Sequence, residues 1–427
     1  MEKYDFILLN LLNLRPDDVK EISTVKALDG SVLYVVTLTN DSLFCPYCNG
    51  DRLESIGYYH KTIKVSNDAL DNCTVILNVQ RKKCLICFKS FSDSKIMTPD
   101  NTKYSYSVIR QLLKLLLNPA MTFNQASILT GIPYNTVLRI FDKHVHVKPV
   151  YFPEVICIDE VYTPNSSYDS KYSCIFYDFL EYKLIDVLPS RKKAYLANYL
   201  TLFPVELRDN VKYVSIDMYQ TYKDISKIYF KKALICADHF HIVKHLNEDL
   251  NHIRIRICKK YDSSSLEYYL LKKFKNLLFD RSVNLHNKGK YNSKFKKVMN
   301  YRDLLDAMLS IDIDLYNAYH LKERYFNFGK MKADDKNLSS TLDELIRDFT
   351  QANIPEFGEF ITLLTNWRQE ILNSFSIMSN GKRINSSIAE SLNASVEKVL
   401  YTSKGIRNPE RRRKRLLYSV NKERFTL

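Results

Sequence analysis

The sequence contains little of what marks fibrous, repetitive or membrane proteins. Its 427 residues include only 9 glycines, 12 prolines and one tryptophan, which excludes a collagen-like or low-complexity chain, and no internal repeat is visible. No apolar run reaches the roughly 20 residues of a membrane span, and the apolar segment 6–14 lacks the basic start of an export signal. The P-loop, HExxH and GxSxG motifs are absent, which excludes those nucleotide hydrolases, zinc proteases and serine hydrolases. We therefore expect a cytoplasmic globular protein without membrane segments.

Positive charge is in excess. Lysine and arginine number 63 against 48 acidic residues, which gives a net charge of +15, and 45% of the residues are hydrophobic. The hydrophobic content indicates a folded chain, and the length predicts about two to four domains. Cations that neutralise phosphates release condensed counterions, so the excess favours a nucleic-acid partner, with a membrane surface or simple solubility as alternatives. Residues 401–427 alone carry a net charge of +7, which predicts a basic tail.

Cysteine is present in an odd number, nine, and without an export signal it does not indicate a disulfide framework. Four of the cysteines form two CxxC pairs, Cys45 with Cys48 and Cys84 with Cys87, which are separated by 35 residues. Two such pairs bring four thiolates to one ion, so we predict a structural Zn²⁺ site. A redox pair or a site without metal is the alternative, and Cys73 is predicted to be a buried thiol.

A helix-turn-helix is predicted within residues 101–149. Thr122 and Gln125 form a capping box at the start of one helix, which we expect to end at Gly131. The next helix, at about residues 134–144, carries polar side chains suited to reading the major groove of DNA. These side chains are Asn135, Thr136, Arg139 and Lys143. The alternative is an ordinary helical hairpin that links two domains.

Residues 150–258 alternate between apolar, strand-like runs and helical segments. Their order, β-β-β-α-β-α-β-α, predicts a ribonuclease-H-like fold in which a meander is followed by parallel strands. Asp159 and Asp217 each end an apolar strand, where burial disfavours an isolated charge. The first and fourth strands of this fold are neighbours, so we expect both carboxylates at one sheet edge. Two carboxylates this close favour a two-metal site for phosphoryl transfer, with Mg²⁺ as the ion.

A third carboxylate is expected from a helix that packs on the same edge. In the predicted helix 388–400, Glu390, Asn393 and Glu397 share the polar side. We choose Glu390 as the metal ligand and Asn393 as a residue that orients the site or contacts DNA. The alternative is a helix face that is only solvated.

Further polar residues lie near the predicted strands. Glu160 follows the first aspartate and, by strand alternation, is expected to point to the other face. Asp178 and Asp186 lie in the meander and are interpreted as ordinary surface residues. Asp238 and His241 follow the fifth strand and are predicted to support the site, with a purely structural histidine as the alternative.

A series of short motifs resembles, in the same order, those of the ISL-three-type insertion-sequence transposases, a bacterial DDE family. The motifs are the paired CxxC, the helix-turn-helix, and residues 158–160, 188–191, 215–218, 237–243, 379–381, 388–393 and 404–408. The resemblance covers nearly the whole chain. It implies a ribonuclease-H-like core that is interrupted by a helical insertion, with Asp159, Asp217 and Glu390 as a DDE triad that holds two Mg²⁺ or Mn²⁺ ions.

The same resemblance implies a transposase that binds the terminal inverted repeats of an insertion sequence and catalyses DNA cleavage and strand transfer. Its partners would be double-stranded DNA, both element ends and target, and further copies of itself in a dimer or higher oligomer at the nucleoid. Residues 382–387 and Ser391 depart from the family pattern, which keeps open a catalytically inactive or domesticated copy that only binds DNA. A general nuclease on the same fold is a further alternative.

The predicted fold is a multidomain α+β protein built from five consecutive segments. These are a zinc-binding domain (1–100), the helix-turn-helix (101–149), the first part of the catalytic core (150–258), the helical insertion (259–380), and the final core helix with the basic tail (381–427). In that tail, Arg411, Arg412 and Arg413 are predicted to contact DNA near the catalytic metals.

Overall fold

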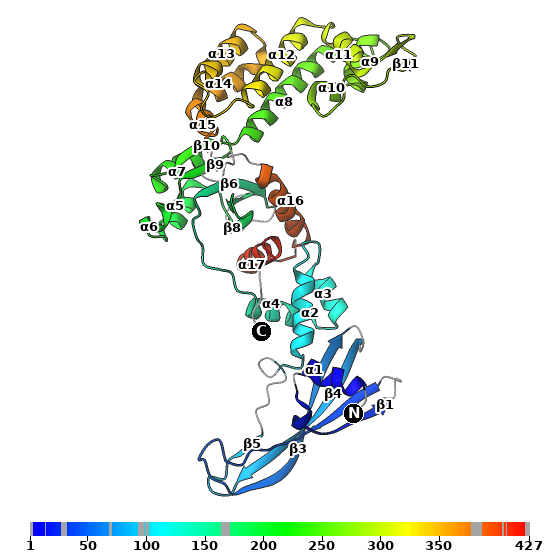
Figure 1. Cartoon of the computed structure of the whole chain (residues 1–427), viewed down its shortest axis with the longest axis vertical. Coiled ribbons are helices and arrows are strands. Elements are labelled where there is room, and N and C mark those ends of the chain that lie inside the picture. The colour runs from blue at the N-terminus through cyan, green and yellow to red at the C-terminus, as the bar shows by residue number, and fades with distance from the viewer. Residues whose placement is uncertain are drawn as a thin grey trace. The chain divides into compact units, whose positions relative to one another are not determined.

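The computed structural model describes most of the chain, which divides into two units. The described residues are 3–12, 14–26, 32–67, 71–92, 98, 102–163, 171–376, 387–403, 405–406 and 408–422. The terminal unit comprises Met1–Pro149 and Ser395–Leu427, and the central unit comprises Val150–Ala394. The boundary falls inside helix α16 (Ser387–Thr402), which therefore contributes to both units (Figure 1).

The terminal unit contains a five-stranded sheet. Its strands are β1 (Val19–Lys26), β2 (Val32–Leu38), β3 (Leu53–Asn67), β4 (Asp71–Cys84) and β5 (Ser90–Ser92). The strand order is β1-β2-β4-β3, with β5 on β4; β2 and β4 are parallel and the other pairs antiparallel. Alternate residues such as Ile63 and Val65 are fully buried, because successive side chains point to opposite faces. Helix α1 (Lys3–Leu12) packs Leu8 against this face.

The long interval between the two CxxC pairs is a hairpin. Strands β3 and β4 pair antiparallel over most of their length, and Leu53 lies opposite Cys84. The chain therefore leaves the first CxxC and returns to it, which brings cysteines that are far apart in sequence to one end of the sheet.

Three short helices follow the sheet, α2 (Tyr106–Leu116), α3 (Phe123–Thr130) and α4 (Tyr134–His144). The predicted capping box is confirmed: the Gln125 amide donates to the Thr122 hydroxyl and the Thr122 amide to the Gln125 side chain, both at 3.0 Å. Gly131 ends α3 with a left-handed φ of 62°, a conformation that suits glycine.

The expected basic tail contains a packed helix, α17 (Pro409–Val420). Arg415 is only 1% exposed and donates to the backbone carbonyls of Leu116, Asn118 and Met121. Tyr418 is also buried and joins the core of the three helices. The tail folds because one cation finds several carbonyl acceptors while the apolar side of its helix is buried.

The central unit is built on a second five-stranded sheet. Its strands are β6 (Val155–Tyr162), β7 (Tyr172–Asp178), β8 (Lys183–Leu188), β9 (Tyr213–Ile216) and β10 (Leu234–Ala237). The order is β10-β9-β6-β7-β8, in which β6, β7 and β8 form an antiparallel meander and β6, β9 and β10 are parallel. The predicted neighbourhood of the first and fourth strands, β6 and β9, is confirmed.

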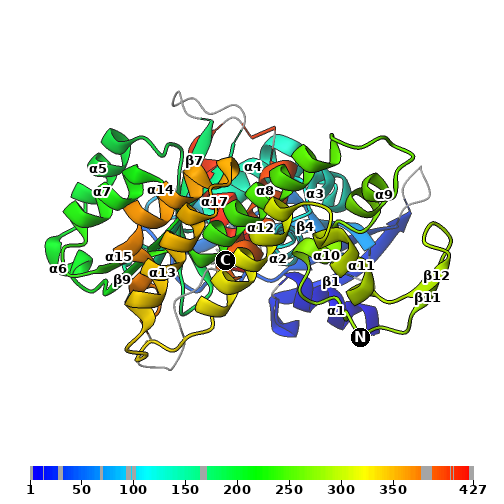
Figure 2. The same cartoon turned by 90° about the horizontal axis from the view of Figure 1, so that it is seen from above.

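Helices connect these strands and continue into a helical block. The connecting helices are α5 (Lys193–Thr201), α6 (Val205–Arg208) and α7 (Gln220–Tyr229). The 20-residue helix α8 (His239–Cys258) leads from β10 into the block (Figures 1 and 2). The block comprises α9 (Leu266–Lys273), α10 (Asn276–Phe279), β11 (Lys290–Asn292), β12 (Lys297–Met299), α11 (Tyr301–Leu309), α12 (Ile313–Phe328), α13 (Leu338–Gln351), α14 (Gly358–Asn366) and α15 (Arg368–Asn373). Among the described residues, no helix is long and apolar enough to cross a membrane.

The last helix of the block, α15, contacts the sheet and one of its connecting helices. In α15, the Asn373 side-chain amide donates to the backbone carbonyl of Ile235 in the edge strand β10, at 2.8 Å. The buried Glu370 of the same helix forms an ion pair with Lys223 of α7, at 2.8 Å. Covering an edge strand with a helix satisfies its free backbone groups and blocks pairing with another chain.

Two acidic residues of the meander are buried, which corrects the expectation that they lie at the surface. Asp178 and Asp186 are each 1% exposed. Asp178 accepts hydrogen bonds from the Tyr151 hydroxyl and from two backbone amides after β7, and Asp186 accepts one from the Tyr199 hydroxyl. Buried carboxylates persist where such donors replace water.

We predict that Arg415→Met lowers the free energy of unfolding of the terminal unit by about 3 kcal/mol, because buried carbonyls that lose their donor cost about 1–3 kcal/mol each. Burial lowers the pKa of Arg415 to about 10, so the side chain is still protonated at neutral pH. Urea denaturation measures the change. The control is Arg110→Met at an exposed position of α2, where a change within about 0.5 kcal/mol is expected. Equal losses in both variants would contradict the bracing role of Arg415.

Candidate active site and cysteine cluster

The four cysteines of the two CxxC pairs form one cluster in the terminal unit. Their sulfur atoms all lie within 4.8 Å of one another. Contacts join the two pairs: Cys45 Sγ lies 3.6 Å from Cys87 Sγ, and Cys48 Sγ lies 3.6 Å from Cys84 Sγ. Four thiolates about 2.3 Å from a central Zn²⁺ in a tetrahedron would be about 3.8 Å apart. The cluster can therefore hold a metal ion such as zinc, and contacts between the pairs do not favour a redox pair inside one CxxC.

Each CxxC lies in a tight turn that supports this arrangement. The Cys45 amide donates to the Gly50 carbonyl at 2.8 Å, and the Cys84 amide donates to the Lys89 carbonyl at 3.0 Å. Backbone hydrogen bonds to sulfur, first from the Cys87 amide, lower the pKa of Cys84, so its thiolate is favoured.

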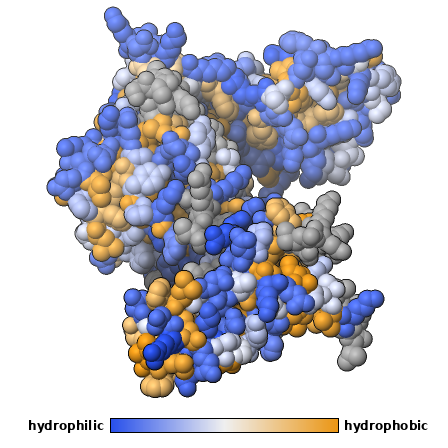
Figure 3. Space-filling view, turned by 60° about the horizontal axis from the view of Figure 1, so that its bottom comes forward, coloured by the Kyte–Doolittle hydropathy of each residue, from blue (hydrophilic) through white to orange (hydrophobic). Residues whose placement is uncertain are grey.

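Large apolar side chains around these turns are exposed. Phe88 is 69% exposed and Tyr47 is 59% exposed, and Lys89 lies over the Tyr47 ring at 4.9 Å. Figure 3 shows apolar surface at the end of the terminal unit that carries the turns. Cys73 is half-buried and lies outside the cluster.

The predicted DNA-reading residues lie on the outer side of α4. Asn135, Arg139 and Lys143 are exposed and Thr136 is half-buried. The opposite side of the helix is buried in the three-helix core through residues such as Phe141. The arrangement is that of an amphipathic helix with a solvent-exposed polar face.

The three predicted arginines of the tail already have partners within the terminal unit. Arg411 contacts Asp142 of α4 through Nε and Nη2, at 2.6–3.0 Å. Arg412 donates to the Ile406 carbonyl at 2.7 Å, and Arg413 lies 3.5 Å from Glu410.

In the central unit, three aspartates each come directly after one of three residues that are aligned across neighbouring parallel strands. Ile158 of β6 is paired with Ile216 of β9, and Ile216 is paired with Ala237 of β10. The next residue of each strand or loop is an aspartate. These residues are Asp159, Asp217 and Asp238.

The strand β6 continues to Tyr162, so Asp159 lies inside a strand rather than at its end, which corrects the sequence prediction. Its position still lies just beyond the end of the neighbouring β9. Asp217 and Asp238 do follow the last residues of their strands, β9 and β10.

Asp159 is held by two hydrogen bonds. It is 7% exposed, and its Oδ1 accepts from the Glu160 amide at 2.7 Å. Its Oδ2 accepts from Asn393 Nδ2 of α16 at 2.5 Å. The Asn393 oxygen in turn accepts from the Tyr177 hydroxyl of β7. One amide therefore connects α16 to two strands, as predicted for a residue that orients the site.

His241 lies between two of the aspartates. Its Nε2 is 4.0 Å from Asp159 Oδ1 and 3.7 Å from Asp238 Oδ2. Asp238 also accepts a hydrogen bond from the Phe240 amide at 2.8 Å and caps α8. Both residues, predicted as supporting groups, are therefore brought next to Asp159.

Negative charge is concentrated at this edge of the sheet. Burial, followed by the repulsion of Glu160 and Asp159, raises the pKa of Asp217 to about 7, although the Tyr219 amide and His241 act in the opposite direction. A carboxylate in this environment is stabilised either by a proton or by a cation. The donor set, carboxylate oxygens, is the set that Mg²⁺ prefers.

Arg191 is a residue of this edge to which the sequence reasoning assigned no role. It forms an ion pair with Glu160, and its guanidinium lies 4.3 Å from the Tyr172 ring centre and 4.7 Å from that of Tyr219. The only sequence signal was its place in the motif 188–191, directly after β8.

Glu390, the predicted third carboxylate, belongs to the first turn of α16, three residues before Asn393. Its side chain lies outside the described residues. The segment 382–387, where the sequence departs from the family pattern, is likewise outside them except for Ser387 at the start of α16.

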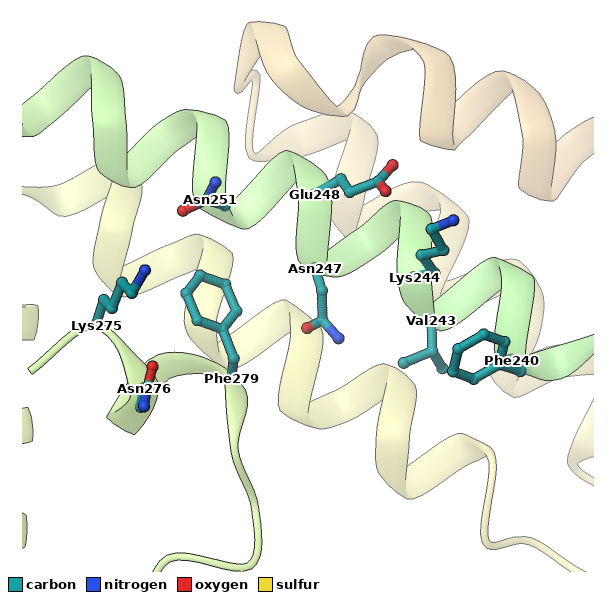
Figure 4. Close-up of a pocket in the computed structure, with 9 residues that line it drawn as sticks. All are labelled: Phe240, Val243, Lys244, Asn247, Glu248, Asn251, Lys275, Asn276 and Phe279. Carbon is teal, nitrogen blue, oxygen red and sulfur yellow. The ribbon is translucent and has the colours of Figure 1, made fainter. Parts of the chain in front are cut away.

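A cavity of about 440 Å³ lies along α8. Phe240, Lys244 and Asn247 of α8 line one side, and Lys275 and Phe279 line the other. Figure 4 shows Asn247 and Phe279 directed into the space between the two segments. The cavity begins at Phe240, the residue before His241.

The comparison with protein families decides the identity. The model of a transposase family matches residues 156–416, which is more than half of the chain. The protein belongs to the ISL-three-type DDE transposase family. The match begins in β6 and ends in α17, so it includes the aspartates, the helical block and α16 of this transposase. Among curated proteins, none matches the chain.

We expect the transposase to carry one metal ion per chain at the cysteine cluster. Cys45→Ser or Cys87→Ser should release it, because a tetrahedral thiolate site tolerates the loss of a ligand poorly. Elemental analysis of the purified protein measures the metal content. Cys73→Ser, which leaves the cluster intact, is the control and should keep the metal; full retention by both cluster variants would exclude this site.

Proposed function

We propose that this transposase binds the terminal inverted repeats of its insertion sequence and catalyses metal-dependent DNA cleavage and strand transfer by a DDE mechanism. The single observation that carries the proposal is the shared register of Asp159 and Asp217 on neighbouring parallel strands. The strand order supports a ribonuclease-H-like core, because the meander β6-β7-β8 is extended next to its first strand by β9 and β10. Family membership supports the activity.

Asp159, Asp217 and Glu390 are the proposed ligands of two divalent ions, Mg²⁺ or Mn²⁺. When bound, the ions supply activation of the attacking oxygen and stabilisation of the leaving oxygen. The protein's own part is to hold the carboxylates in position. Asn393 and the Glu160 amide fix both oxygens of Asp159, and helical spacing in the sequence assigns Glu390 to the side of α16 that carries Asn393.

Positively charged and hydrogen-bonding groups surround the proposed ligands. His241 Nε2 lies within 4.0 Å of Asp159 and Asp238, where its ring would face a nearby phosphate oxygen. Arg191 neutralises Glu160, which limits repulsion with the ligand aspartates. These residues are positioning groups in the proposal and take no part in bond making.

The terminal unit is the proposed DNA-recognition part. The cysteine cluster would hold a structural Zn²⁺, and the outer face of α4, with Asn135, Thr136, Arg139 and Lys143, would read bases or phosphates. We further propose a dimer or higher oligomer on the two element ends, and a cytoplasmic, nucleoid-associated location, as expected for an enzyme that acts on bacterial DNA.

Loss of the second aspartate tests the mechanism. We expect Asp217→Asn to reduce Mg²⁺-dependent cleavage and strand transfer on duplexes that carry the flanking inverted repeats by roughly 10³-fold or more, because one ligand of the metals is lost. Asp262→Asn, at an exposed aspartate of the central unit, is the matched control and should react normally.

The same assay separates the alternatives. Wild-type rates in Asp217→Asn would refute the proposed site. Specific end binding by the wild type without cleavage identifies an inactive, DNA-binding copy, and cleavage that ignores the end sequence identifies a general nuclease.

The orienting role of Asn393 gives a second prediction. Asn393→Ala should lower the cleavage rate about 10–100-fold and raise the Mg²⁺ concentration that gives half the maximal rate, because Asp159 loses a hydrogen bond that orients it. Tyr177→Phe, which removes only the hydroxyl that bonds Asn393, should shift the metal dependence in the same direction by less. An unchanged metal dependence in both variants would show that Asn393 has a structural role alone.

A further inference from the structure

The hairpin β11–β12 carries an unbalanced positive charge. Residues 281–302 contain seven lysines and arginines and no aspartate or glutamate. Five of the cations, all lysines on or beside the hairpin, are exposed, and among the described residues none of them lies within 4 Å of a carboxylate oxygen. These lysines are Lys288, Lys290, Lys294, Lys296 and Lys297.

The hairpin is anchored although its tip is exposed. Met299 at its base is 4% exposed and belongs to the core of the central unit. In the turn, the buried Asn292 side chain accepts hydrogen bonds from the Lys294 amide at 3.1 Å and the Phe295 amide at 3.4 Å. The lysines are therefore held on a defined support, which reduces the entropy that binding would cost.

One face of the hairpin carries exposed apolar side chains. Tyr291 and Val298 are a cross-strand pair, and they are 67% and 65% exposed. An exposed aromatic and an exposed aliphatic residue gain little stability at this position in water, whereas both fit the sugar edges of a nucleic-acid groove between phosphate-bound lysines.

In helix α17, by contrast, positively charged side chains stabilise the fold. Its arginines are used inside the terminal unit: Arg411 contacts Asp142 and Arg415 is buried among carbonyls. Cations with internal partners have little left to offer a phosphate. Within the described residues the hairpin lysines have no carboxylate partner, so their charge is available to a polyanion.

The hairpin lies far from the aspartates within the central unit. Both views show it at the end of the helical block that is farthest from the sheet (Figures 1 and 2). Helix α8 begins at the aspartates, and its 20 residues span about 30 Å. Two further lysines, Lys244 and Lys275, lie along this helix at the cavity. A duplex rises about 3.4 Å per base pair, so 30 Å corresponds to about nine base pairs.

We propose that the β11–β12 hairpin is a clamp for the phosphate backbone of duplex DNA, which it grips about nine base pairs or more from the phosphate at the aspartates. The proposal deepens the proposed function and rests on it, since it takes the DNA substrate from there. Exposed lysines of the hairpin contact neighbouring phosphates, and the Tyr291–Val298 pair lies against the sugars.

The salt dependence of DNA binding tests the clamp. In the full-length protein, Lys290→Gln, Lys294→Gln and Lys297→Gln combined should lower the slope of log affinity against log salt by about two to three, since each lost phosphate contact removes about 0.9. The matched control changes three exposed lysines elsewhere on the block, Lys330→Gln, Lys332→Gln and Lys336→Gln, and should alter the slope by less than about one. The probe is a duplex that carries the inverted repeat flanking the coding sequence.

Duplex length provides a second measurement. The difference between wild type and the hairpin variant should appear only when the duplex extends more than about nine base pairs past the cleavage position on one side. Equal slopes for wild type and variant on long duplexes, or an equal loss in the control, would overturn the clamp. A full difference on short duplexes would overturn its distance from the aspartates.

Failure of the clamp and failure of the proposed function give different results. Asp217→Asn should keep the wild-type salt slope and lose cleavage, whereas the hairpin variant should lose slope. If Asp217→Asn cleaves DNA while the hairpin variant loses slope, the proposed catalytic site is wrong and the clamp stands. If cleavage follows the prediction and the slopes are equal, only the clamp is wrong.

Discussion

The parallel register of β6, β9 and β10 is the constraint on which the organisation of the central unit depends. Backbone hydrogen bonds align Ile158, Ile216 and Ala237, and the residue after each of them is an aspartate. Carboxylates gathered in this way repel one another, and burial adds to that cost, as the raised pKa of Asp217 shows. Surrounding donors, such as the Asn393 amide, reduce the repulsion without removing it. Helix α16 gains its link to β6 and β7 through this network.

Cationic groups have two distinct uses in the protein. A buried arginine such as Arg415 stabilises the fold because its planar group satisfies several carbonyls at once. Arg191, held between two tyrosine rings, offsets a carboxylate beside the aspartates. The lysines of the β11–β12 hairpin do neither in the described part of the chain, where no carboxylate oxygen lies within 4 Å of them. A net charge of +15 therefore overstates the charge that is free to act on a partner, and the location of each cation matters more than the sum.

Features that depend on neighbouring residues were predictable from the sequence. The capping box of Thr122, the helix end at Gly131 and the strand runs of the central sheet follow from local hydrogen bonding, backbone freedom and side-chain alternation. The CxxC spacing was sufficient to predict that four cysteines meet, since the chemistry of a thiolate site demands it. The neighbourhood of β6 and β9 followed from the order of strands and helices along the chain.

Features that depend on distant partners were not predictable from local patterns. The sequence indicates which residues are charged, but only the folded chain decides that Asp178 and Asp186 are buried beside tyrosine hydroxyls and that the basic tail packs as α17. The pairing of Glu160 with Arg191, 31 positions apart, has no local signature. The reason is physical: propensities, caps and short motifs are set by interactions within a few residues, whereas the burial of a charge depends on whether a donor from elsewhere in the chain replaces its water. Composition and motifs therefore determine the chemical class of this protein, and tertiary contacts determine which of its charges hold the fold together and which remain for DNA.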